Sequence, residues 1–131
     1  MADEDTWMVR EGEPMYHRLR IYDQAGRIGD ETWNLVSAWD VSAKDAVGKP
    51  LVRAADSIAA NLAEGSGRGT HPELLRFART ARGSLCETQH WVLRPKQRKL
   101  LETRTAEELE ASLESLLKQV NAFISKMARK P

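Results

Sequence analysis

Glutamate and histidine are common metal ligands, and they stand three positions apart in the motif Glu87-x-x-His90. In ferritin-like di-iron bundles, two such motifs act together with a glutamate from each of the other two helices. This chain has one such motif, and neither His17 nor His71 has a glutamate three residues before it. Glu64 could supply one further carboxylate. Because this ligand set is incomplete, we expect no metal centre and no other cofactor.

The candidate nucleophiles are Cys86, Ser57 and Ser84. Cys86 is the single cysteine and follows Leu85 in a helical pattern, with no base apart from a distant histidine, so we expect a small, buried side chain. Ser57 and Ser84 lack the strained turn that exposes a hydrolase nucleophile. We therefore expect no catalytic residues and predict that the protein is not an enzyme. A single cysteine also excludes an internal disulfide and fits a reducing compartment.

The glycine-rich stretch from Gly65 to Gly69, GSGRG, is a candidate phosphate loop. A true phosphate loop follows a strand and ends in Gly-Lys-Ser/Thr, and neither feature is present here. We interpret the stretch as a turn between two helices, in which Gly65 ends the first helix in the left-handed conformation. Thr70 and Glu73 have the spacing of a capping box that opens the next helix. A simple anion site at that helix start, aided by Arg68, stays open as an alternative.

Apolar residues at three-and-four spacing predict four amphipathic helices. They cover about residues 15–36, 42–64 and 72–93, and the fourth begins at Thr105, where Glu108 completes a second capping box. Pro50 lies inside the second span and predicts a kink or a restart, and Pro95 is expected to end or bend the third helix. Four such helices with short connections predict an all-α fold, an up-down-up-down four-helix bundle.

The length of 131 residues fits one domain with a real core. Residues 1–13 carry five acids against Arg10 and show no helical periodicity, so we expect a disordered acidic tail before a bundle domain over residues 14–131. No apolar run approaches the roughly 20 residues that span a bilayer. The N-terminus also lacks the basic start and apolar stretch of a secretory signal. We expect a cytoplasmic protein with no membrane partner.

The net charge of +1 conceals an uneven distribution. Residues 66–104 carry nine bases and three acids, a net charge of +6, whereas residues 105–131 carry four of each. Such a segment is typical of a polyanion-binding surface, although the arginines of one solvated helix face would give the same count. We predict phosphate contacts, without reading of sequence, from the following residues: Arg68, Arg76, Arg79, Arg82, Arg94, Lys96, Arg98 and Lys99.

The central stretch also carries a pattern that helix periodicity alone does not produce. It reads Arg53-Ala-Ala, Ser57-Ile, Asn61-Leu-Ala-Glu64-Gly65, Gly67-Arg68, Phe77 and Ala81-Arg-Gly83-Ser84-Leu-x-Glu87, after an upstream Tyr16-x-x-Leu-x-Ile-Tyr-x-x-Ala25. These residues resemble the four-helix-bundle proteins encoded in bacterial 23S rRNA intervening sequences. The motif positions are Arg53, Asn61, Glu64, Gly65, Arg68, Gly83, Ser84 and Glu87.

The resemblance implies a four-helix bundle that assembles with itself into a ring-like homo-oligomer, a pentamer. It also implies similarity to the accessory proteins of diversity-generating retroelements, which are basic barrels that engage nucleic acid and a reverse transcriptase. Our leading hypothesis is a non-enzymatic oligomeric bundle that binds structured RNA or DNA. The alternative is a scaffold that binds a partner protein and no nucleic acid, with the tryptophans as anchors: Trp7, Trp33, Trp39 and Trp91.

Overall fold

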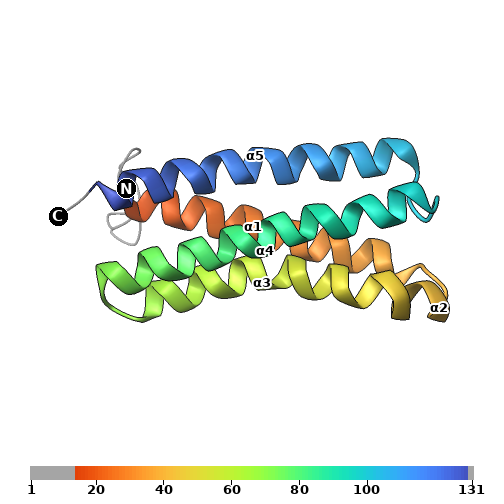
Figure 1. The fold of residues 1–131 in the computed structure, drawn as a ribbon, viewed down its shortest axis with the longest axis horizontal. Helices are drawn as coiled ribbons and strands as arrows, with labels where there is room; N and C mark the ends of the chain where they lie inside the picture. Colours follow the sequence, from red (N-terminus) through yellow and green to blue (C-terminus); the bar gives the residue numbers. More distant parts are fainter. Residues whose placement is uncertain (1–13, 130–131) are drawn as a thin grey trace, which may run out of the picture.

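The computed structural model describes the backbone of residues 14–129 and the side chains of residues 19–129. Four long helices account for most of the chain (Figure 1). They are α1 (Pro14–Ser37), α3 (Lys49–Gly67), α4 (His71–Gln97) and α5 (Thr103–Ala128). A short α2 (Val41–Ala43) and a π-helical turn, η2 (Lys44–Gly48), lie between α1 and α3. The four predicted helices are confirmed, and the second is divided.

The four long helices form an antiparallel bundle in which each helix packs beside its neighbours in sequence (Figure 1). α3 lies against α1 and α4, and α5 closes the bundle by lying against α4 and α1. The predicted all-α, up-down-up-down arrangement is therefore confirmed. One end of the bundle carries the start of α1, the α3–α4 turn and the end of α5. No helix within residues 14–129 is long and apolar enough to cross a membrane.

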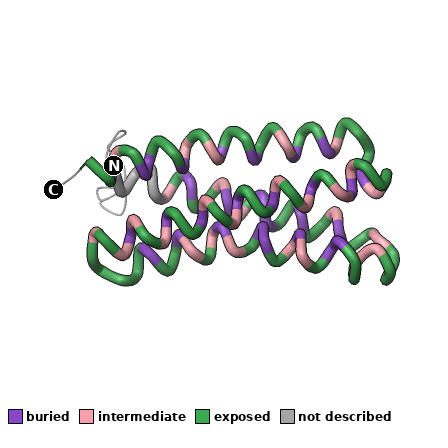
Figure 2. The backbone as a smooth tube through the Cα atoms, in the orientation of Figure 1, coloured by how far each residue is buried: buried purple, intermediate pink, exposed green. Residues whose placement is uncertain are grey.

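The core runs along the whole bundle axis and is built from the predicted apolar stripes (Figure 2). Its largest fully buried side chains include Phe123, Leu113 and Leu85. Burying a side chain of this size stabilises a fold by about 1.5–3 kcal/mol. Thr32 is buried in α1 without a polar penalty because its hydroxyl donates to the Ile28 carbonyl at 2.7 Å.

The helix does not restart at Pro50, because Gly48 and Lys49 keep right-handed helical dihedrals and η2 runs directly into α3. The irregularity near Pro50 is instead the π-helical turn that precedes it. The π-helical turn before it ends at Gly48, which is buried against Val36. A Cβ at Gly48 would lie 2.7 Å from Val36 Cγ1, so glycine permits the close approach of η2 to α1.

The predicted ending of the helix at Gly65 is wrong. α3 continues to Gly67, and the left-handed residue of the turn is Gly69, with a φ of 83°. Gly65 is buried inside the helix, where a Cβ would lie 2.8 Å from Phe77 Cβ and 3.3 Å from the Leu74 carbonyl oxygen. Glycine is required at position 65 for the contact between α3 and α4, and not for a left-handed turn.

Of the two predicted helix starts, the one at Thr70 is confirmed and the one at Thr105 is wrong. The Thr70 hydroxyl accepts from the Glu73 amide at 3.3 Å, which confirms the N-cap of α4. The second capping box is wrong, because α5 begins two residues earlier than predicted, with Glu102 as its N-cap residue. The Ala106 amide donates to the Glu102 carbonyl at 2.9 Å, and the Glu108 carboxylate lies 3.5 Å from Arg104 Nε instead.

Pro95 lies within α4 and does not end it at once. The helix continues to Gln97, four residues beyond the predicted end. The chain then turns through Lys99, which has a left-handed φ of 60°. A residue with a Cβ is strained in that conformation by about 1–2 kcal/mol.

Candidate nucleic-acid interface

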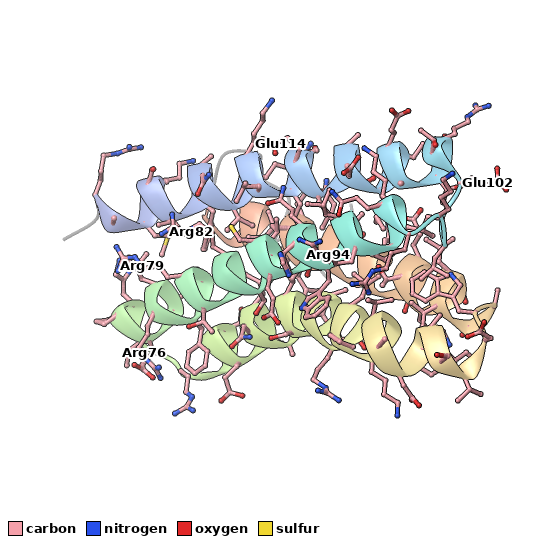
Figure 3. All side chains as sticks on the ribbon, turned by 45° about the vertical axis from the view of Figure 1, so that its right-hand side comes forward. Arg76, Arg79, Arg82, Arg94, Glu102 and Glu114 are labelled. Atoms are coloured by element: carbon pink, nitrogen blue, oxygen red, sulfur yellow. The ribbon has the colours of Figure 1, made fainter. Side chains whose placement is uncertain are left out.

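Adjacent segments of α4 and α5 carry bases and no acids at one end of the bundle. Residues 74–86 of α4 contain Arg76, Arg79 and Arg82 and neither Asp nor Glu. Residues 115–129 of α5 contain Lys118, Lys126 and Arg129, again with neither Asp nor Glu. We name these two segments together the basic half of the α4–α5 pair; Figure 3 shows its α4 arginines.

Two hydrogen bonds fix the register of the basic half. Arg82 Nη1 donates to Asn121 Oδ1 at 3.1 Å, midway along the two segments. At the end of the bundle, His71 Nε2 donates to the Met127 carbonyl oxygen at 2.8 Å, which ties the start of α4 to the end of α5. The two segments therefore lie side by side, and Arg82 contacts α5 across the seam between them.

Four cations of the basic half have no carboxylate partner among residues 14–129. Arg79, Lys118 and Arg129 are exposed and make no ion pair with another described residue. Arg82 is half-buried, and its partner Asn121 is a neutral amide, so its charge is not compensated locally. These guanidinium and ammonium groups can bind an external anion without first breaking an internal ion pair.

Arg68 and Arg76, both predicted phosphate contacts, are engaged within the protein instead. Arg76 donates to both carboxylate oxygens of Glu73 at 3.0 Å, and its Cζ lies 4.4 Å from the centre of the Phe77 ring. This hydrogen bond from Arg76 lowers the pKa of Glu73. Arg68 Nε lies 2.9 Å from Glu64 Oε2, with its Cζ 5.1 Å from the same ring. The two arginines cover Phe77 and brace the α3–α4 turn.

The predicted contacts Arg94, Lys96, Arg98 and Lys99 lie toward the other end of the pair. Residues 87–97 and 103–114, which we name the opposite half, carry five acids and three bases: Glu87, Glu107, Glu108, Glu110, Glu114, Arg94, Lys96 and Arg104. Lys96 Nζ lies 3.0 Å from Glu110 Oε1. Twelve residues separate Arg94 from Arg82, which is roughly 18 Å along a helix. The structure therefore does not unite the predicted residues into one surface.

Sequence reasoning missed Lys118 and Arg129 because it summed charge over the whole segment 105–131. That segment carries its four acids within residues 107–114 and its four bases from residue 118 onward. The two groups cancel in the sum, but the acids lie in the first half of α5, whereas Lys118 and Lys126 lie in its second half and Arg129 at its end. Counting charge over each half of a helix would have revealed the separation.

Part of the Arg53–Glu87 block serves the packing of α3 on α4. The hydroxyls of Ser57 and Ser84 lie 2.9 Å apart, and Asn61 Nδ2 donates to Ser57 Oγ at 2.9 Å and to its carbonyl at 2.8 Å. Gly65 provides the close approach described above. Gly83, in contrast, is exposed, and a Cβ there would meet no atom within 4 Å.

The residues with catalytic or metal-binding potential do not come together. Glu87 Oε2 accepts from Trp91 Nε1 at 3.3 Å, and the exposed His90 packs edge-on against the Trp91 ring. In the part of the chain that the structure describes, no three His, Cys, Asp or Glu side chains are grouped as metal ligands. The predicted burial of Cys86 is wrong: one residue beyond buried Leu85, a helix turns its side chain to solvent.

Trp33 is the exposed tryptophan of the described residues, with 61% of its surface accessible. It lines a groove of about 580 Å³ between α1 and the start of α3, together with Val36, Val52 and three cations: Lys44, Lys49 and Arg53. Trp39 and Trp91 are partly buried against the core. Trp7 and the predicted disordered tail lie outside the described residues.

Comparison with known proteins agrees with the fold. The chain is similar to a crystal structure of a protein with unknown function from the S23 ribosomal protein family of Bacteroides thetaiotaomicron. The TM-score is 0.77 at 16% sequence identity, and the match covers 83% of this chain and 98% of that one. No curated protein matches the chain. The family model described as 23S rRNA-intervening sequence protein matches residues 17–122, which is most of the chain. The protein thus belongs to the 23S rRNA-intervening sequence protein family.

Proposed function

We propose that this protein is a non-enzymatic binder of structured RNA or DNA and that the basic half of the α4–α5 pair contacts the phosphates. One observation carries the proposal. Two adjacent antiparallel helix segments carry six bases and no acids at one end of the bundle, and four of those bases have no carboxylate partner within residues 14–129. The function needs no cofactor, because charge alone attracts the polyanion.

The shape and chemistry of this surface favour a duplex over a single strand. The α4 segment of thirteen residues is roughly 20 Å long, which spans several phosphates of one duplex face. Single-strand binders stack bases on exposed aromatic rings. The exposed large apolar side chains of the described chain, Tyr22, Trp33, Val41 and Leu93, lie outside the basic half, and Arg68 and Arg76 cover Phe77.

Affinity should therefore depend strongly on salt and weakly on base sequence. Each neutralised phosphate contributes about −0.9 to the slope of log K against log salt for duplex DNA. If Arg79, Arg82, Lys118 and Arg129 each contact one phosphate, the slope should be about −3 to −4.

The test is fluorescence anisotropy of a labelled RNA or DNA duplex at low and moderate salt, with two charge-matched double variants. Arg79→Ala with Arg129→Ala removes two cations without a carboxylate partner, and we expect weaker binding and a slope smaller by about 2. Arg27→Ala with Arg104→Ala removes two cations that pair with Asp23 and Glu108. Equal losses in both double variants would show a general charge effect and contradict the assignment.

We also propose, from the family resemblance, that copies of the chain assemble into a ring-like homo-oligomer, a pentamer. Light scattering coupled to size-exclusion chromatography would measure the mass directly. The expected value is five times the chain mass of 14.8 kDa. A particle with the mass of one chain at micromolar concentration would contradict the proposal.

A second candidate function is a scaffold that binds a partner protein at the Trp33 groove. The observation in its favour is the 61% exposure of Trp33 beside Lys44, Lys49 and Arg53, which suits an apolar side chain flanked by acids. Co-purification of one protein without nucleic-acid absorbance, abolished by Trp33→Ala and retained in Arg79→Ala, would favour this function. If co-purification were lost in Arg79→Ala and retained in Trp33→Ala, the Trp33 groove would be excluded as the binding site for the partner protein.

A further inference from the structure

The residues before α1 form the most acidic stretch of the chain. Residues 1–13 carry Asp3, Glu4, Asp5, Glu11 and Glu13 against Arg10, a net charge of −4. The whole chain has a net charge of +1, so the remainder has a net charge of +5. The acidic residues come in two clusters, one at each end of the apolar group Trp7, Met8 and Val9.

The fold places the origin of this stretch at the same end of the bundle as the basic half, next to α5 and diagonal to α4. α1 begins at Pro14, at the end of the bundle where α5 finishes, and α5 packs against α1 (Figure 1). Arg129 is the residue that caps the end of α5, and Arg79 and Arg82 lie on α4 next to it. The opposite half, with its five acids, lies away from Pro14.

The length of the stretch is sufficient to reach across the basic half. Thirteen residues in extended form span at most about 45 Å. The basic half is roughly 20 Å long and two helices wide, with neighbouring helix axes about 10 Å apart. The stretch can therefore cover this surface without full extension.

The charges also match. The basic half offers four cations without a carboxylate partner among residues 14–129: Arg79, Arg82, Lys118 and Arg129. On α1, α3 and the opposite half, several bases already have carboxylates, such as Arg27 with Asp23, Lys49 with Asp45 and Lys96 with Glu110. An acidic peptide tethered at Pro14 thus has its nearest uncompensated cation cluster on the basic half.

We propose that residues 1–13 dock on the basic half of their own chain and compete there with external polyanions. The docking stands on charge and tethering alone, and only the competition depends on the proposed nucleic-acid function. The contacts are exposed ion pairs, so the docking weakens with salt. Removal of the stretch should raise duplex affinity on the order of tenfold at low salt, with a smaller effect at moderate salt.

The docking can be measured without nucleic acid. Cys86 is the single cysteine, is exposed and lies one helical turn beyond Arg82, so a nitroxide spin label on it reports approach to the basic half. We expect selective broadening of the NMR amide signals of residues 3–5 at low salt, and sharp signals at high salt. A label at Ser42→Cys in a Cys86→Ser background lies at the far end of the bundle and should leave these signals sharp.

A charge-neutral stretch of the same length provides the matched variant, with all five acids and the one base replaced: Asp3→Asn, Glu4→Gln, Asp5→Asn, Arg10→Gln, Glu11→Gln and Glu13→Gln. In this variant, the NMR amide signals of residues 3–5 should stay sharp when the spin label is on Cys86. Unbroadened signals in the native sequence, or broadening that survives this neutralisation, would overturn the docking. Broadening in a mixture of isotope-labelled and spin-labelled chains, and not within one chain, would overturn the same-chain arrangement.

Duplex anisotropy then tests the competition. Deletion of residues 1–13 and the charge-neutral variant should raise affinity equally, because the acids and not the tryptophan are responsible. Unchanged affinity in both variants would overturn the competition. If broadening is present and no variant binds duplex, the proposed function fails while the docking stands.

Discussion

The two halves of the α4–α5 pair share one apolar seam and differ in what they present to solvent. Leu113 in the opposite half and Val120 in the basic half are both fully buried. The opposite half carries five acids among its charges, and the basic half carries none. Core packing therefore imposes no charge pattern on the outer surface. The separation of charge along α5 is a property of the surface, and it is the feature on which the proposed binding function rests.

The largest expected effect tests whether the two halves form one folding unit. Leu113→Ala should destabilise the protein by about 2–5 kcal/mol, because it leaves a cavity in a dry core. Urea unfolding followed by circular dichroism would measure it. Ser112→Ala, at the exposed neighbouring position, should change stability by less than about 0.5 kcal/mol. Two separate transitions in Leu113→Ala would show that the halves unfold independently and would break the comparison.

Substitution of two glycines, Gly65 and Gly83, by alanine should change the stability of the protein in opposite directions. Gly65→Ala should cost about 1–3 kcal/mol, because the new Cβ would lie 2.8 Å from Phe77 Cβ and press α4 away. Gly83→Ala should stabilise the protein by about 0.5–1 kcal/mol, because it removes a helical glycine in open space. Thermal unfolding of both variants measures the difference. A stabilising Gly65→Ala would contradict the account of the α3–α4 contact.

Lys99→Gly sharpens the comparison at the turn between α4 and α5. Glycine relieves the left-handed φ of 60°, and the higher entropy of the unfolded glycine offsets part of the gain, so stability should rise by up to about 1 kcal/mol. Lys99→Ala removes the same charge without relieving the backbone and should give no gain. Duplex affinity should change little in either variant. A loss comparable to that of Arg79→Ala would extend the interface to the α4–α5 turn.

The smallest expected effect on stability concerns the carboxylate of Asp56 on α3, outside the α4–α5 pair. Partial burial, followed by the nearby charge of Asp30, raises the pKa of Asp56 above its ordinary value of 3.8. Because the folded pKa is raised, stability is lost as pH rises through it, and Asp56→Asn should recover that loss at neutral pH. The side chain is largely exposed, so the gain should be a few tenths of a kcal/mol. Unfolding at neutral pH and at pH near 3 should show the gain at the higher pH alone.

The sequence predicted the features that depend on local pattern. The Thr70 cap depends on residues three apart, and the core stripes depend on helical period, so both followed from the chain itself. Cys86 was also predictable, since the period that buries Leu85 turns the next residue outward. The prediction that Cys86 is buried was wrong because it relied on the residue type and not on the position in the helical period.

Other features depend on how the helices meet. Which glycine of the turn is left-handed depends on the approach of α4 to Gly65, which no local rule contains. The basic half depends on the register between α4 and α5, which Arg82–Asn121 and His71–Met127 make visible. The sequence carried the charges, but only the antiparallel pairing brings the segment with Lys118 and Arg129 beside the segment with Arg79.

Amide chemical-shift mapping of the isotope-labelled protein with an unlabelled duplex tests the central claim most directly. We expect the perturbed signals to cluster in residues 74–86 and 115–129, with little change in residues 87–97 and 103–114, and to fade as salt is raised. Perturbations centred on residues 94–104 or on the Trp33 groove, or none at low salt, would contradict the claim that the basic half is the interface.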